Sequence, residues 1–183
     1  MGQMLTDLGD LLAARGLRYH LAVIGGTALL LRAVVDRTTR DVDAIGMLED
    51  GEWVPLDELP PDLAGAVEDV ALLHGESKDW LNARPRDLLR IGMPRGWEER
   101  LSHSTFGGAL EISVIGRIDL IHTKLYALTD SGPLSKHAAD LLALSPSAAE
   151  LRDASTWCRQ HDTSPTFADQ LEEAVAWLHS QLS

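Results

Sequence analysis

A pair of glycines between two short apolar runs is the feature that most constrains the fold of this 183-residue chain. Residues 19–24 are mostly apolar and suit a buried strand, and residues 41–45 suit a second strand. Between them, residues 25–27 indicate a turn and residues 28–34 have the character of a helix. The pattern predicts two adjacent strands joined by a helix, with the glycines directly after the first strand.

Two carboxylates lie two residues apart on the second predicted strand. Because strand side chains alternate, Asp41 and Asp43 leave the same face while Val42 packs inward. Carboxylates this close repel each other unless a cation lies between them. Mg²⁺ is commonly held by one or two carboxylates together with water and substrate phosphates. The triplet therefore predicts a magnesium site, with room for a pair of ions about 3.5–4 Å apart.

Gly25 and Gly26 supply the complementary half of such a site. Glycines let the backbone approach phosphate oxygens closely, and the start of a helix adds unpaired N–H groups and a favourable dipole. We therefore expect an anion-binding turn about fifteen residues before the metal-binding pair.

The remaining pattern predicts an α+β fold with a small mixed sheet flanked by helices, followed by a C-terminal helical part. The first part covers residues 1–116 and the second covers residues 117–183, packed on the core or continuous with it. Ser147 and Glu150 have the spacing of a helix-capping box. The other expected elements are helices at 3–15, 63–73, 117–129, 135–143, 147–160 and 166–181, short helices within 80–98, a loop at 46–60, and a hairpin of 101–106 with 110–115.

Charge and composition exclude several classes of protein. The formal net charge of −12 argues against a broad surface that coats nucleic acid, although it permits a local basic site. No apolar run reaches the roughly 18 residues of a membrane span. The single cysteine, Cys158, excludes an intrachain disulfide framework. Together these features favour a cytoplasmic protein without a membrane partner.

The ordered motif resembles the nucleotidyltransferase superfamily of DNA polymerase β. The resemblance rests on Ile24-Gly25-Gly26-Thr27 followed by Asp41-Val42-Asp43, within roughly residues 20–45. A second segment, roughly residues 105–145, is similar to the helix of AbiEii-type toxin nucleotidyltransferases and their small bacterial relatives, in which Lys follows Asp after four residues. Asp119 and Lys124 carry that similarity here.

The resemblance implies a third carboxylate on a later strand, and Glu111 is the candidate for it. Glu111 lies between the apolar Leu110 and Ile112, so it leaves the opposite face of its strand from them. In the family pattern it would join Asp41 and Asp43 as a metal ligand or act as the base. An ordinary solvent-facing glutamate is the alternative interpretation.

The resemblance also implies residues that hold the nucleotide. Lys124 would contact a phosphate, and Asp119 would position either Lys124 or the loop at the metal site. An ion pair of Lys124 with Asp119 or Asp140 is the alternative. The full set of nucleotide-binding candidates is Gly25, Gly26, Thr27, Arg40, Lys124 and Asp119.

The leading hypothesis is a Mg²⁺-dependent enzyme that moves a nucleoside monophosphate from an NTP to an acceptor hydroxyl. The resemblance implies a toxin–antitoxin setting, an RNA acceptor such as tRNA and an antitoxin-like protein partner. Because the acidic balance argues against a broad nucleic-acid-binding surface, small-molecule and protein acceptors stay open beside RNA. Two alternatives are a catalytically inactive nucleotide- or partner-binding protein on the same fold, and a structural interaction protein.

Overall fold

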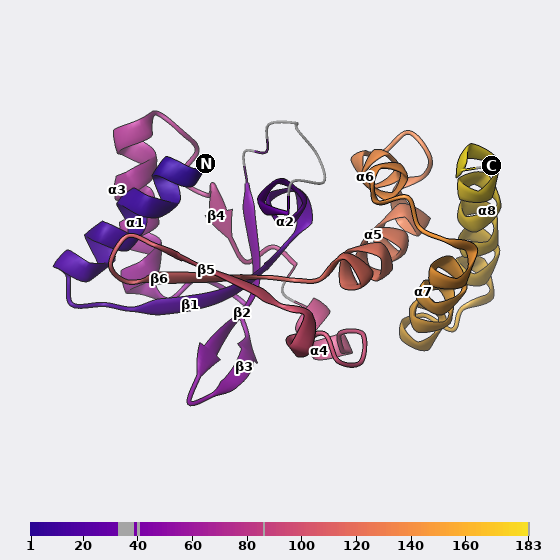
Figure 1. Ribbon diagram of the computed structural model, residues 1–183, viewed down its shortest axis with the longest axis horizontal. Coiled ribbons are helices and arrows are strands. Elements are labelled where there is room, and N and C mark those ends of the chain that lie inside the picture. The colour runs from indigo at the N-terminus through magenta and orange to yellow at the C-terminus, as the bar shows by residue number, and fades with distance from the viewer. Residues whose placement is uncertain (33–38, 40, 86, 183) are drawn as a thin grey trace.

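A computed structural model describes residues 1–32, 39, 41–85 and 87–182. Its architecture is mixed α+β, as predicted. A six-stranded sheet is flanked by helices, and a block of helices follows at one end of the sheet (Figure 1).

The central strand of the sheet is β1 (Tyr19–Ile24), whose two neighbouring strands run in opposite directions. It pairs antiparallel with β2 (Val42–Glu49) and parallel with β6 (Leu110–Val114). Therefore the end of β1, the start of β2 and the end of β6 meet at one edge of the sheet. The full order is β3-β2-β1-β6-β5, with β3 at Glu52–Pro55, β5 at Ser102–Phe106, and the short β4 (Leu81–Asn82) pairing with β2.

Two long helices pack together beside the sheet. α1 (Gly2–Ala14) has leucines at helical spacing, and Leu5, Leu8 and Leu12 are completely buried. α3 (Pro61–His74) contacts α1 and ends at Gly75, whose φ of 65° is the left-handed conformation that suits a helix C-cap. Their buried residues belong to the apolar core, which also includes residues of the sheet and of the C-terminal helices, while the two helices themselves lie at the opposite end of the molecule from α7 and α8 (Figure 1).

The structure corrects the prediction of a loop at residues 46–60. β2 continues to Glu49 and turns through Asp50 and Gly51 into β3. Both turn residues have positive φ values, 49° and 87°, as a type I′ hairpin turn requires. The acidic composition concealed the strands, although Asp-Gly is a strong hairpin signal. The helix expected at residues 28–34 also differs, because α2 (Gly25–Leu31) begins at the first glycine.

The C-terminal helices agree with the predicted bounds to within two residues. They are α5 (Arg117–Ser131), α6 (Lys136–Leu144), α7 (Ala148–His161) and α8 (Pro165–Leu182), and they pack on one another (Figure 1). The predicted capping box is present, since the Ser147 backbone N–H donates to Glu150 and the Glu150 N–H donates to the Ser147 hydroxyl. None of the helices in the described ranges combines the length and apolarity that a bilayer crossing requires.

Gly9 on α1 provides a test of how closely this helix packs on the β5–β6 hairpin. A Cβ atom at Gly9 would lie 1.8 Å from the carbonyl oxygen of Phe106, so Gly9→Ala must displace the helix. We expect a loss of about 1–3 kcal/mol in the free energy of unfolding, the usual cost of overpacking. Gly65→Ala in α3 is the matched control, because nothing lies within 4 Å of its added methyl group. It should gain about 0.5–1 kcal/mol. The free energy of unfolding of both variants can be measured by urea denaturation. Equal changes in the two variants would contradict the close packing at Gly9.

Candidate active site

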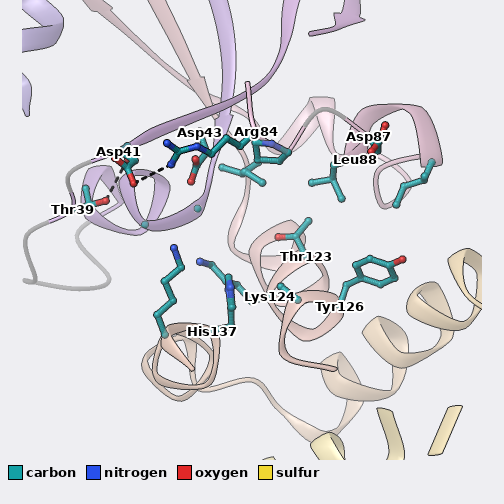
Figure 2. A pocket seen from close by; sticks show the side chains of 17 residues that line it. Thr39, Asp41, Asp43, Arg84, Asp87, Leu88, Thr123, Lys124, Tyr126 and His137 are labelled. Atoms are coloured by element: carbon teal, nitrogen blue, oxygen red, sulfur yellow. Dashed lines mark hydrogen bonds and ion pairs between the residues drawn. The ribbon is translucent and has the colours of Figure 1, made fainter. Parts of the chain in front are cut away.

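A cavity of about 450 Å³ opens at the edge of the sheet where β1 ends and β2 begins. One wall consists of the sheet edge and the start of α2, and the opposite wall consists of α5 and α6 (Figure 2). α4 (Leu88–Ile91) closes a third side. The polar and glycine residues that line it are Gly25, Gly26, Thr39, Asp41, Asp43, Arg84, Asp87, Thr123, Lys124, Tyr126, Lys136 and His137.

Asp41 and Asp43 both line this cavity, while Val42 between them is completely buried. The backbone N–H of Val42 donates to the carbonyl oxygen of Trp80 at 2.6 Å, which holds the triplet against the segment before β4. Asp43 also lies opposite Ile24, the last residue of β1. The alternation of the strand therefore directs both carboxylates to the cavity, as Figure 2 shows.

Gly25 lies against the carboxylate of Asp43. Its φ is +79°, and a Cβ atom there would lie 2.6 Å from Oδ2 of Asp43. Any side chain at this position would be strained and would also displace the carboxylate. A glycine is thus required where β1 passes into α2.

The Asp43 carboxyl is partly buried, and burial raises its pKa because ionisation is less favourable away from water. A hydrogen bond from Asn82 and the positive charges of Lys136 and Lys124 act in the opposite direction, whereas the charge of Asp41 raises the pKa further. The site therefore holds a carboxylate whose charge is incompletely compensated by the protein.

Two basic residues that sequence reasoning did not single out as site residues also line the cavity. Arg84 places a guanidinium nitrogen 3.7 Å from Oδ2 of Asp41 and also pairs with Asp79. Lys136, at the first turn of α6, is exposed and faces the same space. Lys136 belongs to the segment that resembles the toxin nucleotidyltransferases. Arg84 belongs to no recognisable sequence motif, so only the folded structure identifies it as a residue of the cavity.

Lys124 reaches the cavity from α5, but its ammonium group is already engaged by another side chain of the protein. Its Nζ donates to Oδ2 of Asp140 at 2.6 Å, and both side chains are almost completely buried. The alternative of an ion pair with Asp140 is therefore what the structure shows. Figure 2 shows Lys124 and His137 facing the aspartates across the cavity.

Thr27 does not line the cavity, in contrast to its expected role with the phosphates. Its side chain is completely buried, and its hydroxyl donates to the backbone carbonyl of Asp41 at 2.6 Å. Thr27 thus fastens α2 to the start of β2. Arg40, another nucleotide-binding candidate from the sequence, for which an ion pair with Asp36 is the alternative, lies outside the described residues, as does Asp36.

Asp119 also has a different position from the expected one. It is completely buried, accepts a hydrogen bond from the backbone N–H of Gly116 at 3.0 Å, and pairs with Arg100. It caps the first turn of its own helix, α5, and it is not among the residues that line the cavity, whereas the ion pair of Lys124 is with Asp140. Its position in the sequence is therefore explained by its role in capping α5, without a role in nucleotide binding.

Glu111 is separated from the two aspartates by the register of the sheet. It lies opposite His20 on β1, whereas Asp43 lies opposite Ile24. Four residues along a strand correspond to about 13 Å. The expected convergence of Glu111 with Asp41 and Asp43 is therefore not found. Among the described residues, the other carboxylate that lines the cavity is Asp87, which lies far from the pair in Figure 2.

The buried Lys124–Asp140 pair can be tested by a double-mutant cycle with Lys124→Met and Asp140→Leu. Each single change removes the ion-pair partner of a buried charge and should cost about 3–5 kcal/mol, whereas the double variant should lose much less than the sum. The exposed pair of Arg159 with Glu172, 2.6 Å apart, is the control and should couple by less than about 1 kcal/mol. Additive losses at Lys124 and Asp140 in urea unfolding would contradict the pairing.

Replacing Asp43 by Asn tests the effect of burial on its charge. Because the pKa of Asp43 is higher in the folded than in the unfolded state, ionisation destabilises the metal-free protein. This penalty is absent below the unfolded pKa of about 3.9, grows as the pH rises through the folded pKa, and is complete above it. Asp43→Asn should therefore be more stable than the native protein at pH 7, by a margin that vanishes towards pH 4.

The matched control for that experiment is Glu49→Gln, which removes an exposed carboxylate at the other end of the same strand. It should show no such pH-dependent gain in thermal unfolding with a chelator present. A native protein as stable as Asp43→Asn across this range would contradict the penalty.

Comparison with known proteins agrees with the motif on which the site is built. The family model described as "Nucleotidyltransferase of unknown function (DUF6036)" matches residues 3–133, which include β1, α2, β2, β6 and α5. Neither the comparison with curated proteins nor the comparison with solved structures produced a match. Since the family model covers well over half of the chain, this chain belongs to that family of nucleotidyltransferases.

Proposed function

We propose that this chain is a metal-dependent nucleotidyltransferase that moves a nucleoside monophosphate from an NTP to an acceptor hydroxyl, on a nucleotidyltransferase-type fold. The observation that carries the proposal is the pair of carboxylates at Asp41 and Asp43, which faces a cavity with lysines on its opposite wall. Family membership supports the reaction class.

The residues of the site fit a hard divalent cation such as Mg²⁺. Asp41 and Asp43 provide oxygen ligands, the type that Mg²⁺ prefers. Burial raises the pKa of Asp43, and the charge of Asp41 adds to this effect, so a bound cation would stabilise the ionised form of Asp43. When bound, Mg²⁺ would polarise the reacting phosphate and offset the charge of the departing pyrophosphate.

The same cavity has features suited to a triphosphate. Gly25 and Gly26 line the cavity at the start of α2, whose first backbone N–H groups could donate to phosphate oxygens, and Lys136 provides an exposed positive charge. Lys124 also lines the cavity, but its pairing with Asp140 offsets most of its charge, so its main contribution would be a fixed ammonium donor. A volume of about 450 Å³ is within the range of pockets that bind small molecules.

In the proposed reaction, the oxygen of the acceptor hydroxyl forms a bond to the α-phosphorus of the NTP. The bond from that phosphorus to the oxygen bridging to the β-phosphate breaks, pyrophosphate leaves with the electron pair, and the hydroxyl proton passes to solvent. The contribution of the chain is to orient the nucleotide and stabilise its charge, which are the main sources of catalysis in such transfers.

One observation favours a second candidate function, nucleotide binding without turnover. Glu111, the expected third carboxylate, lies at the other end of β1 from the pair. Within the described ranges, the only group of three metal-ligating side chains excludes both Asp41 and Asp43. A site with two carboxylates would still bind a metal–nucleotide complex.

The residues of the cavity indicate a metal ion and a nucleotide, but they do not identify the acceptor. A toxin-type action on RNA and an antitoxin-like partner rest on the resemblance to AbiEii-type enzymes, and a net charge of −12 opposes an extended RNA-binding surface. The acceptor screen should therefore include tRNA, small hydroxyl compounds and protein, including the chain itself.

The decisive experiment follows label transfer from α-³²P-NTPs to that acceptor panel, with and without Mg²⁺. The native protein should transfer label only with the metal. Asp43→Asn should lose more than about 100-fold in rate, beyond the 10–100-fold typical of residues that only orient metal ligands. Glu49→Gln on the same strand should retain the native rate.

Thermal unfolding with NTP and Mg²⁺ separates the two candidate functions. Stabilisation of the native protein that Asp43→Asn abolishes, without label transfer to any acceptor, would establish the binding function and overturn the enzyme. Transfer that Asp43→Asn leaves intact would overturn the assignment of the site.

A further inference from the structure

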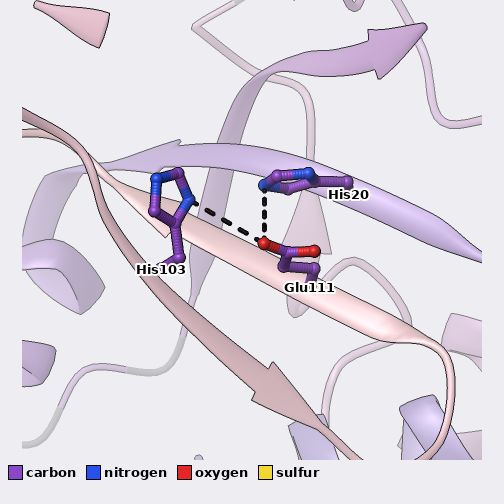
Figure 3. A group of neighbouring side chains, drawn as sticks. All are labelled: His20, His103 and Glu111. Atoms are coloured by element: carbon purple, nitrogen blue, oxygen red, sulfur yellow. Dashed lines mark ion pairs between the residues drawn. The ribbon is translucent and has the colours of Figure 1, made fainter. Parts of the chain in front are cut away.

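A second cluster of metal-ligating side chains lies at the opposite end of β1 from the cavity. His20 on β1 is opposite Glu111 on β6, and His103 on β5 is opposite Ser113 on β6. Glu111 and Ser113 are two residues apart, so all four side chains leave the same face of the sheet. Three neighbouring strands thereby place two imidazoles and a carboxylate together (Figure 3).

The atoms of this cluster converge on a common centre. Nε2 of His20 lies 3.6 Å from Oε1 of Glu111, and Nδ1 of His103 lies 3.9 Å from the same oxygen. One ligand atom from each of the three residues lies within 4.8 Å of the others. Two atoms each about 2.1 Å from a tetrahedral ion are about 3.4 Å apart, so small side-chain rotations would complete the coordination.

The same residues do not form a serine–histidine–carboxylate catalytic group. Nε2 of His20 lies 2.5 Å from the hydroxyl of Ser113, but Glu111 approaches this same nitrogen. In a catalytic triad the carboxylate holds the other ring nitrogen. Ser113 is also completely buried, so no substrate reaches it. Nδ1 of His103 contacts the same hydroxyl at 2.7 Å, so Ser113 holds both rings inward in the metal-free protein, and these two nitrogens would exchange the hydroxyl for the ion on binding.

We propose that His20, His103 and Glu111 form a binding site for a divalent transition-metal ion of the Zn²⁺ class, separate from the aspartate pair. Two imidazole nitrogens and one carboxylate oxygen are ligands that such ions prefer, in contrast to the all-oxygen set at Asp41 and Asp43. The side chain of His103 is 53% exposed, so water has access to the remaining coordination position.

Aromatic packing keeps one of the ligands in place without the metal. The rings of His20 and Trp53 meet edge to face with centroids 5.0 Å apart, and Trp53 in turn packs against Trp97. Pre-orientation of a ligand reduces the entropic cost of binding. Because the ligands come from β1, β5 and β6, a bound ion would cross-link three strands and stabilise the folded protein.

The test is calorimetric titration of the full chain with Zn²⁺ after removal of metals by a chelator, together with visible absorption of the Co²⁺-substituted protein and thermal unfolding. The native protein should bind one Zn²⁺, unfold at a higher temperature with it, and show the d–d absorption of Co²⁺ bound by nitrogen. His103→Ala and Glu111→Gln should each weaken binding by about 10–100-fold or more.

Two controls separate this site from other metal binding. His74→Ala alters another histidine paired with a carboxylate, Asp7, which within the described ranges belongs to no three-ligand group, and should leave Zn²⁺ binding unchanged. Asp43→Asn should also retain it. Absence of Zn²⁺ binding by the native protein, or equal binding by His103→Ala and Glu111→Gln, would overturn the proposal. Loss of binding in Asp43→Asn alone would assign the ion to the aspartate pair instead.

Discussion

The close approach between Gly25 and Asp43 is the contact on which the arrangement of the site depends. The positive φ of Gly25 lets the chain pass from β1 directly into α2, and the missing side chain leaves space for the Asp43 carboxylate. The antiparallel register then places Asp43 opposite Ile24, and the Thr27 hydroxyl holds the carbonyl of Asp41. A larger residue at position 25 would disturb the sheet edge, the helix start and the carboxylate together.

This arrangement concentrates negative charge at a partly buried edge and therefore opposes stability. Burial and the neighbouring Asp41 both raise the pKa of Asp43, which means that its ionised form is disfavoured in the folded protein. The cations nearby are placed so that they compensate this charge only in part. Lys124 is bound to Asp140, and Arg84 is shared between Asp41 and Asp79. Perturbed pKa values cluster at functional sites, which agrees with the proposed binding of a metal–nucleotide complex here.

Local patterns predicted the fold well because they depend on neighbours in sequence. The glycine pair, the alternation at Asp41 to Asp43 and the hairpin before residue 115 each reflect contacts within about twenty residues. Positions set by distant contacts could not be predicted in the same way. The alternation of side chains along a strand correctly predicted that Glu111 lies on the opposite face from its apolar neighbours. Its position along the strand direction is set by the parallel register of β6 on β1, which the sequence does not reveal. Asp119 was misleading because a helix-capping carboxylate and a ligand can have the same spacing from Lys124.

The register of β6 also limits where a third carboxylate can arise. The β6 residue nearest in height to Asp43 is Val114, which pairs with Val23 and is buried with Ile115 in the apolar core. A carboxylate in either position would lose its hydration without a partner, so this strand cannot carry one there without loss of stability. Within the described ranges, Asp140 is buried against Lys124 and Asp87 lies apart from the pair. The proposed transfer would then depend on positioning and charge, with the acceptor proton passing to solvent.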